Sequence, residues 1–404
     1  MYIGSFKYYL LWSKDTPELD RGLGIWYLPV LISYLLLGLI TLPIYPFKNY
    51  ILFKNKNRSK NKFIEFVFTE NQLKISNELN IIDSIMLNFT NNTNFIKNKS
   101  INISNYKLLI ITVFYGFEVF YYLIKALKSK RVFRNSTRII RMIAIAKVSK
   151  FYLKGSSVFI QYNDHALYNV MLECLAKKLY LKTVYIQHAP VSYLFPPLYH
   201  DLNVLFSEDS IEKYKKTTGI TYSSKNVLRL CDFRFPEKKM LKVNEPKYIL
   251  ICFNELDSLA EVEKCALLFL NNGYKVKLRP HPADKRVFKF GKNFLMSSKS
   301  DSIWSDLSLA KCVIVNESAV PLESLFYGVP TYKLSLFYSV IKDNYNFLSK
   351  GLLNRDYDSL HDLMHDIISS KKTWNENKLS YFLGNIKNKK NEIIKLQNEL
   401  NKLI

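Results

Sequence analysis

The chain has 404 residues, of which 48% are hydrophobic, and its formal net charge is +24. This length is too great for one ordinary hydrophobic core and predicts two domains of about 150 to 200 residues each. The hydrophobic content excludes an intrinsically disordered chain. The excess of positive charge predicts an anionic partner: a membrane surface, a polyanionic substrate or nucleic acid.

Five cysteines are scattered along the chain, and none of them belongs to a CxxC pair. Four lie inside apolar stretches. We therefore expect reduced, buried thiols in a cytosolic compartment and no structural zinc site.

Residues 22–47 form a run of 26 residues without a charge. About 20 apolar residues span a bilayer as a helix, and Trp26 and Tyr45 lie near the two ends, where interfacial aromatic residues belong. The basic flank from Lys48 to Lys62 predicts that the rest of the chain lies on the cytoplasmic side of the membrane. Three prolines in the run leave a segment lying in the interface, or a buried hairpin, as alternatives. We expect residues 1–62 to be an N-terminal membrane-associated helical segment.

No acidic residue occurs between Val119 and Asn163, a stretch that carries ten Lys and Arg residues. Around Arg138 to Lys147 these alternate with apolar residues, a pattern typical of a basic amphipathic helix. Such a helix suits a bilayer surface that carries anionic lipid, or it exposes an ordinary solvated face. The chain has no zinc finger, helix-turn-helix or RNA-recognition signature, so we expect inner-membrane lipid rather than nucleic acid as the partner.

Residues 63–235 are predicted to form a first Rossmann-like domain. Its opening part has short apolar runs, and the asparagine-rich stretch 91–105 is expected to be a loop. Alternation of strand and helix with short links predicts a parallel sheet. The expected strands are 157–161, 181–187 and 203–206, with a helix over 165–180 between the first two.

Polar residues 236–246 are the expected linker, after which the alternation of strand and helix repeats over residues 247–374. In two such halves, ligands bind at the carboxyl ends of the strands and in the cleft between the halves. Heptad-spaced apolar residues over 375–404 predict a C-terminal helix that either packs on the body or forms a short coiled coil. The expected strands are 248–253, 274–278, 312–315 and 329–333, and the expected helices are 256–270, 302–310 and 321–327.

The tripeptide Asn316-Glu317-Ser318 stands between an expected strand and an expected helix. A helix N-terminus offers free N–H groups and partial positive charge to a phosphate, and Ser318 adds a hydroxyl donor. Glu323, one turn into the helix, is placed to accept hydrogen bonds from ribose hydroxyls. The alternative without a functional role is an ordinary strand–helix turn capped by Ser318. Residues 313–330 resemble the donor-site segment of GT-B glycosyltransferases, which implies an α/β fold of two Rossmann-like domains facing a cleft.

A second motif, Arg279-Pro280-His281-Pro282, follows another expected strand. A histidine fixed by flanking prolines suits a phosphate contact, and Arg279 and Arg286 are candidates for further charge-assisted contacts. The motif resembles the His-Pro motif of bacterial sialyl- and polysialyltransferases and of the teichoic-acid glycerol- and ribitol-phosphate polymerases. That resemblance implies a CMP- or CDP-activated donor whose phosphate contacts His281.

The donor segment departs from the commonest GT-B pattern. In that pattern two glutamates are separated by seven residues, and the first would fall at Val315, while Glu317 is out of register. This departure favours a cytidine nucleotide over a UDP- or GDP-hexose donor. No Asp-x-Asp motif is placed to hold a metal, and GT-B enzymes neutralise the leaving phosphate with protein groups, so we expect no metal and no cofactor.

His188 follows the strand expected at 181–187, in the sequence Gln187-His188-Ala189. This segment resembles the strand-Gln-His-Gly element of the same polymerases, which implies that His188 is the general base on the acceptor hydroxyl. Asp164, after the preceding strand, is the alternative base or the group that orients His188.

The sequence thus predicts a metal-independent GT-B glycosyltransferase at the cytoplasmic membrane. It would move a sugar or polyol phosphate from a nucleotide donor to a cell-surface glycan or glycolipid of a capsule, lipopolysaccharide or teichoic acid. Two alternatives stay open: a UDP-sugar 2-epimerase-like enzyme of the same fold, and a non-catalytic basic protein that binds a membrane surface.

Overall fold

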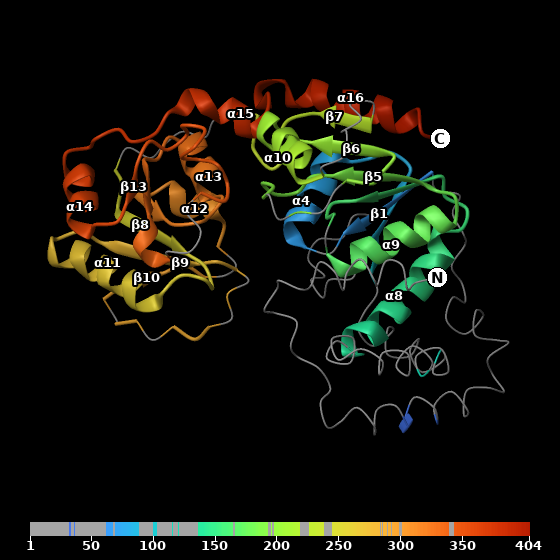
Figure 1. Cartoon of the computed structure of the whole chain (residues 1–404), viewed down its shortest axis with the longest axis horizontal. Helices are drawn as coiled ribbons and strands as arrows, with labels where there is room; N and C mark the ends of the chain where they lie inside the picture. The colour runs from blue at the N-terminus through green and yellow to red at the C-terminus, as the bar shows by residue number, and fades with distance from the viewer. Residues whose placement is uncertain are drawn as a thin grey trace.

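A computed structural model of the chain shows two α/β units, each built on a parallel sheet, with C-terminal helices that run from the second unit back over the first (Figure 1). The structure describes residues 32, 33, 36, 62–67, 69–88, 100–102, 115, 120, 136–164, 166–192, 195, 198–218, 226–237, 245–282, 284, 286–288, 290–291, 293–298, 301–338 and 343–404.

The N-terminal unit contains a seven-stranded sheet in the order β3-β2-β1-β4-β5-β6-β7, and all its paired strands are parallel. Strands β1, β4 and β6 are buried along their whole length, as parallel strands covered by helices on both faces are. The strands are β1 (Phe63–Val67), β2 (Ser84–Asn88), β3 (Ser100–Asn102), β4 (Val158–Gln161), β5 (Lys182–Ile186), β6 (Leu202–Leu205) and β7 (Val227–Arg229), and the helices are α4 (Glu70–Leu79), α8 (Ser136–Leu153), α9 (Leu167–Lys178) and α10 (Glu208–Thr218).

The C-terminal unit contains a six-stranded parallel sheet in the order β10-β9-β8-β11-β12-β13. Its chain order reverses between β8 and β11, and the crevice at the carboxyl ends of two such strands is where open α/β sheets bind ligands. The strands are β8 (Tyr248–Phe253), β9 (Val276–Pro280), β10 (Leu295–Met296), β11 (Ala310–Val315), β12 (Thr331–Leu334) and β13 (Asp356–Tyr357), and the helices are α11 (Leu259–Asn271), α12 (Ile303–Leu307), α13 (Val320–Tyr327) and α14 (Leu360–Ile368).

Two expectations for the N-terminal unit were wrong. The stretch 91–105 is not a loop throughout, because β3 (Ser100–Asn102) pairs in parallel with β2 at the edge of the sheet. The cysteines are not all buried, since Cys174 is exposed on α9 while the other four are buried. Both expectations were based on local composition. Whether a short segment pairs at a sheet edge, and which face of a helix is exposed, depends on tertiary packing that composition does not report.

The carboxylate of Glu65 lies in the middle of the buried strand β1. Its two oxygens accept 2.5 Å hydrogen bonds from the hydroxyls of Ser76, Ser84 and Tyr162. Hydroxyl donors satisfy a buried carboxylate that would otherwise carry a large desolvation cost. An acidic residue therefore occupies a core strand without breaking it.

The basic helix expected around 138–147 is part of α8. Over residues 143–149 every side chain is buried except that of Lys147, which is half-buried and lies 4.6 Å from the centre of the Tyr115 ring. This part of α8 therefore packs into the N-terminal unit and does not present a solvated or lipid-facing stripe.

The C-terminal residues connect the two units. Helix α15 (Leu379–Leu383) lies where the two units meet, against α10 and α13, and helix α16 (Lys389–Asn401) lies over the N-terminal unit alongside β7 (Figure 1). Leu396 and Leu400 belong to the same core cluster as strands of the N-terminal sheet. The buried ammonium of Lys389 donates to the carbonyls of Phe233 and Phe235 at 2.7 and 2.9 Å. Of the two interpretations of the terminal heptads, packing on the body is the one seen here.

Helix α10 also joins the units. The Nζ atom of fully buried Lys213 contacts Asp209 at 2.6 Å and the Tyr345 carbonyl at 3.1 Å, and Lys350 pairs with Glu212 at 2.6 Å. The loop of residues 343–350 in the C-terminal unit therefore rests on α10.

The uncharged run 22–47 lies outside the described residues, apart from Ile32, Ser33 and Leu36, which are helical. Within the part of the chain that the structure describes, no helix combines the length and apolar character that crossing a membrane requires.

Candidate functional site

Apart from Glu323, which is in the first turn of α13, the sequence-predicted residues lie at or just after the carboxyl ends of parallel strands. Gln161 of β4 pairs with Tyr185 of β5. Asp164 follows the end of β4 by three residues and His188 follows the end of β5 by two, so both stand at one edge of the N-terminal sheet. In the C-terminal sheet, His281 directly follows β9, and the 316–318 segment directly follows β11. Since paired parallel strands end at the same edge, each sheet gathers its predicted residues along one side.

Helix α13 begins two residues after Ser318. The Ser318 Oγ accepts a hydrogen bond from the N–H of Val320 at 3.3 Å, and Pro321 occupies the first turn, where a missing N–H costs nothing. The helix has no side-chain bond at its own N-cap, Ala319. Its first turn therefore combines N–H groups, the positive end of the helix dipole and a serine hydroxyl, the chemistry that binds a phosphate.

Asn316 and Glu317 hold this turn in place. Both contact the buried ammonium of Lys333 on β12: Glu317 Oε1 at 2.5 Å and Asn316 Oδ1 at 3.2 Å. The second Glu317 oxygen accepts from the N–H of Asn344 at 2.9 Å, and Asn316 donates to Asp257 at 3.3 Å. These side chains hold β8, β11 and β12 in position relative to each other. In the predicted site, Asn316 and Glu317 therefore have a structural role rather than a binding one.

Glu323 carries an oxygen that lacks a hydrogen-bond partner. Its Oε1 lies 3.9 Å from Nη1 of Arg234, while its buried Oε2 has no hydrogen bond within the described part of the chain. Burial raises the pKa of Glu323, and the nearby Arg234 opposes that rise. A carboxylate oxygen without a donor, one helical turn from Ser318, is suited to accept a hydroxyl hydrogen bond from a ligand.

Arg234 is a site residue that sequence reasoning missed. It follows β7, and its guanidinium donates to both oxygens of Asp232: from Nε at 3.0 and 3.1 Å and from Nη2 at 2.5 Å. Its side chain is 13% exposed and reaches from the N-terminal unit toward Glu323 on α13. The only signal in the sequence was its position just before the expected linker.

Replacing Glu323 with Gln tests how this buried carboxylate makes the stability of the protein depend on pH. Its folded pKa lies above the ordinary value of 4.5, so above pH 4.5 the folded chain binds more protons than the unfolded chain and loses stability as pH rises. We expect Glu323→Gln to flatten that decline in thermal melts from pH 4 to 8, with the melting temperature at pH 7 equal to or above that of the wild type. Glu399→Gln, at a surface pair with Lys402, is the control; an unchanged pH slope in Glu323→Gln would contradict the assignment.

Arg279 contacts protein groups. Its guanidinium pairs with Asp306 and donates to the Asp301 carbonyl at 2.8 Å. Burial raises the pKa of Asp306, but hydrogen bonds from Lys277, Ser297 and Arg279 outweigh that effect and hold it below its ordinary value.

Arg286 is engaged in the same way. It forms bonds to Asp284 and donates to the carbonyls of Asn254 and Asp257 at 2.5 and 2.7 Å. Arg286 therefore links the loops after β8 and β9, whereas Arg279 links β9 to the start of α12.

His281 and Pro282 are exposed at the end of β9. The N–H of His281 donates to the Phe253 carbonyl of β8 at 2.7 Å, which fixes the backbone of the motif at the strand end. Desolvation by the surrounding protein lowers the pKa of His281, against the opposing effect of Glu255 and Asp284.

His188 is half-buried in a segment fixed by its neighbour. The Gln187 side chain accepts from the N–H of Phe206 at 2.9 Å and donates to the carbonyl of Ala189 at 2.8 Å. These bonds tie the turn after β5 to the end of β6. The imidazole therefore stands on a rigid backbone at the sheet edge, as a general base must.

Asp164 is only 5% exposed, and its Oδ2 accepts a 2.5 Å hydrogen bond from the hydroxyl of Tyr214. The Tyr214 hydroxyl lies 3.4 Å from that of Tyr185, and burial together with Asp164 raises the pKa of both phenols. Because Asp164 is buried and bonded to Tyr214, it is better placed to orient neighbouring side chains than to contact an acceptor substrate.

No family model matches the chain, and no curated protein matches its sequence. Solved structures do. A structure of the wall teichoic acid polymerase TagF with CDPG has a TM-score of 0.52 at 10% identity, covering 94% of this chain and 98% of that chain. The S. aureus MnaA–UDP co-structure has a TM-score of 0.54 at 11% identity, covering 85% and 98%. A UDP-N-acetylglucosamine 2-epimerase from Rickettsia bellii has a TM-score of 0.53 at 9% identity, covering 84% and 95%.

The fold is of the GT-B type. Its two parallel-sheet α/β units agree in arrangement with those of TagF and MnaA over nearly the whole length of each. At identities near 10% the likeness establishes the fold, and the chemistry has to be argued from the site itself.

Proposed function

We propose that the chain is a glycosyltransferase that takes a sugar or polyol phosphate from a nucleotide donor bound in the C-terminal unit. The observation that carries this is the N-terminus of α13, placed at the strand-order reversal with Ser318 beside it. One turn on is the buried Oε2 atom of Glu323, which has no hydrogen bond within the described part of the chain. Phosphate at the helix N-terminus and ribose hydroxyls at Glu323 are the matching contacts.

In the proposed transfer step, groups at the carboxyl edges of both sheets take part. His188 accepts the proton of the acceptor hydroxyl as its oxygen attacks the donor carbon, or the donor phosphorus in polyol-phosphate transfer. The bond from that atom to the nucleotide phosphate oxygen breaks, and the nucleotide leaves with the electron pair. The α13 N-terminus and His281 stabilise the negative charge on the departing phosphate.

A cytidine donor is the version we favour, as CMP- or CDP-activated sugar or polyol. It rests on the His-Pro motif at His281 and on the absence of a glutamate at Val315. The neighbour TagF, solved with CDPG, supports it. The acceptor would be a cell-surface glycan or glycolipid of a capsule, lipopolysaccharide or teichoic acid.

Attachment to the cytoplasmic membrane is a further part of the proposal. It rests on the uncharged run 22–47, on the basic flank after it and on the net charge of +24, which suit an anionic bilayer and a lipid-linked acceptor. The buried half of α8 contributes nothing to it.

A UDP-sugar 2-epimerase is the second candidate, favoured by the likeness in fold to the Rickettsia bellii UDP-N-acetylglucosamine 2-epimerase and to MnaA solved with UDP. The two differ in a direct assay. An epimerase interconverts UDP-N-acetylglucosamine and its 2-epimer with no acceptor present, whereas a transferase leaves that sugar nucleotide unchanged.

A thermal-shift screen against CMP, CDP, UDP and GDP tests the proposal, because a ligand that binds only the folded state raises the melting temperature. We expect the cytidine nucleotides to give the largest shift. Ser318→Ala should reduce that shift, since it removes a hydroxyl donor, and the control Ser305→Ala, at an exposed position of α12, should not. If none of the four nucleotides moved the melting temperature, the nucleotide site would be abandoned.

Binding should also depend on pH through His281. Its pKa lies below the ordinary value of 6.5 because of desolvation, so the imidazolium that attracts phosphate forms only as pH falls below 6.5. We expect CDP affinity, measured by calorimetry, to rise from pH 7.5 to 5.5, and the rise to be smaller in His281→Ala. Equal pH slopes in the two proteins would remove His281 from the site.

A further inference from the structure

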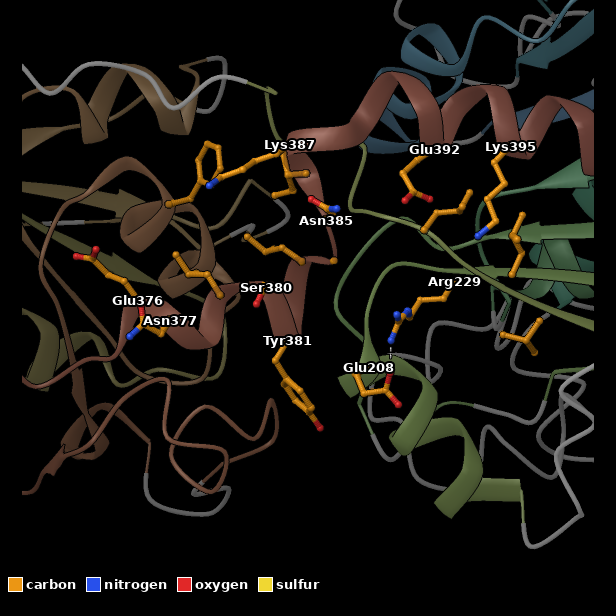
Figure 2. A pocket seen from close by; sticks show the side chains of 18 residues that line it. Glu208, Arg229, Glu376, Asn377, Ser380, Tyr381, Asn385, Lys387, Glu392 and Lys395 are labelled. Atoms are coloured by element: carbon orange, nitrogen blue, oxygen red, sulfur yellow. Dashed lines mark hydrogen bonds and ion pairs between the residues drawn. The ribbon is translucent and has the colours of Figure 1, made fainter.

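A pocket with a volume of about 1000 Å³ lies where the C-terminal helices meet the edge of the N-terminal sheet (Figure 2). Strand β7 forms one wall, the segment from α15 to α16 forms another, and Phe326 of α13 closes the side toward the C-terminal unit. Small-molecule sites occupy about 300 to 1,000 Å³. The pocket is therefore at the upper end of that range, with room for an extended ligand.

The pocket contains a polar group that the described protein does not satisfy. Glu392 on α16 lines it, and its Oε2 is buried with no hydrogen-bond partner within the described part of the chain. Figure 2 shows the side chains of Glu392 and Lys395 both pointing from α16 toward the wall that carries Arg229. A buried acceptor without a donor costs free energy, and a ligand hydroxyl would supply the donor.

The charges of the lining balance. Three cations, Arg229, Lys387 and Lys395, face three carboxylates, Glu208, Glu376 and Glu392. Arg229 is already paired with Glu208 at 2.6 Å. A polyphosphate would be repelled by the carboxylates of this pocket as much as it is attracted by the cations. The pocket therefore does not favour an anionic ligand, whereas the α13 N-terminus does.

The remaining lining alternates hydrogen-bonding and apolar groups. Amides, hydroxyls and one phenol line the pocket together with apolar side chains. Among the side chains drawn in Figure 2, Arg229 and Glu208 are the pair joined by an interaction. The Tyr381 phenol is directed toward Glu212 and Lys350. Amide and carboxylate groups match hydroxyls, and aromatic and aliphatic surface matches the C–H faces of a sugar ring. The polar members are Asn377, Ser380, Tyr381 and Asn385, and the apolar members include Leu228, Leu230, Phe326 and Ile386.

We infer that this pocket binds a neutral oligosaccharide, as a subsite separate from the donor site. The inference rests on the proposed function in one respect: in a glycosyltransferase the ligand would be a distal part of the acceptor glycan. Because the lining comes from both units and from the segment that joins them, a bound saccharide would contact all three.

Saturation-transfer NMR with maltopentaose, cellopentaose and chitopentaose tests the inference on the full-length protein. We expect at least one pentasaccharide to bind, and its Kd to rise at least about tenfold, or about 1.4 kcal/mol, in Glu392→Ala and in Ser380→Trp. Glu392→Ala removes an unsatisfied carboxylate and should fold as well as the wild type, so it serves where Ser380→Trp does not fold. The matched control is Glu399→Ala, two turns further along α16 and outside the pocket.

CDP binding, measured on the same samples, separates this inference from the proposed function. If CDP binds and no pentasaccharide does, or if the two pocket variants bind the saccharide as well as Glu399→Ala does, the subsite is overturned and the proposed function stands. If the saccharide binds in the pocket and no nucleotide binds, the subsite stands and the proposed function falls.

Discussion

Replacing Gly384 with alanine should strongly destabilise the protein. The residue has φ +70° and ψ −164°, a region that only glycine occupies readily, and a Cβ there would lie 2.5 Å from the Phe206 carbonyl oxygen and 2.6 Å from that of Leu230. Both contacts are with backbone that cannot move aside. Backbone strain of about 1–3 kcal/mol and overpacking of a similar size add to a loss of about 2–6 kcal/mol, measured as a fall in the denaturation midpoint.

Gly273→Ala is the matched control for this change. Its φ is +80°, but a Cβ there meets no atom within 4 Å, so only the backbone strain remains. The difference between the two variants reports how closely the segment between α15 and α16 approaches the ends of β6 and β7. Equal losses in the two variants would show that this close approach is absent in solution.

Replacing Lys333 with methionine should also have a large effect. The ammonium is 3% exposed, contacts Glu317 at 2.5 Å and Asn316 at 3.2 Å, and lies 3.8 Å from Asp356. Removing one partner of a buried pair costs about 3–5 kcal/mol, because the other charge is left unpaired. Burial already raises the pKa of Asp356 and Lys333 opposes that rise. The loss measured by chemical denaturation should therefore be greatest near pH 7 and smaller at acid pH, where Asp356, with its raised pKa, takes up a proton.

Two further variants check the Lys333 result. Lys264→Met removes an exposed partner of Glu261 and should cost no more than about 1 kcal/mol. The double variant Lys333→Met with Glu317→Leu removes both charges and should recover part of the loss. A Lys333→Met protein as stable as Lys264→Met would contradict the support role given to Lys333.

Most of the alternation of strands and helices after residue 156 could be predicted, because its period and short links are local. The strand expected at 248–253 has those bounds as β8, and the 312–315 strand is the end of β11. The part before residue 156 could not be placed. Glu65 obscures β1 as a core strand, since its hydroxyl partners come from 11 to 97 residues away.

The candidate site shows the same difference between local patterns, which the sequence reveals, and long-range contacts, which it does not. Ser318, His281 and His188 could be proposed from sequence because each belongs to a short motif next to a strand end, and the structure places all three at such ends. The engagement of Arg279 with Asp306, 27 residues later, and of Glu317 with Lys333, 16 residues later, depends on sheet packing that no local pattern records. Arg234 belongs to the other unit from Glu323, so only the fold reveals that the two face each other.

Hydrogen exchange with and without saturating CDP tests the location of the nucleotide most directly. Phosphate at the N-terminus of α13 would accept hydrogen bonds from its first-turn N–H groups and slow their exchange. We predict that protection is greatest in peptides covering residues 316–324, with a second protected segment at 279–284, and that Ser318→Ala reduces both. Protection confined to the N-terminal unit, or none in 316–324 while CDP is bound, would contradict the account.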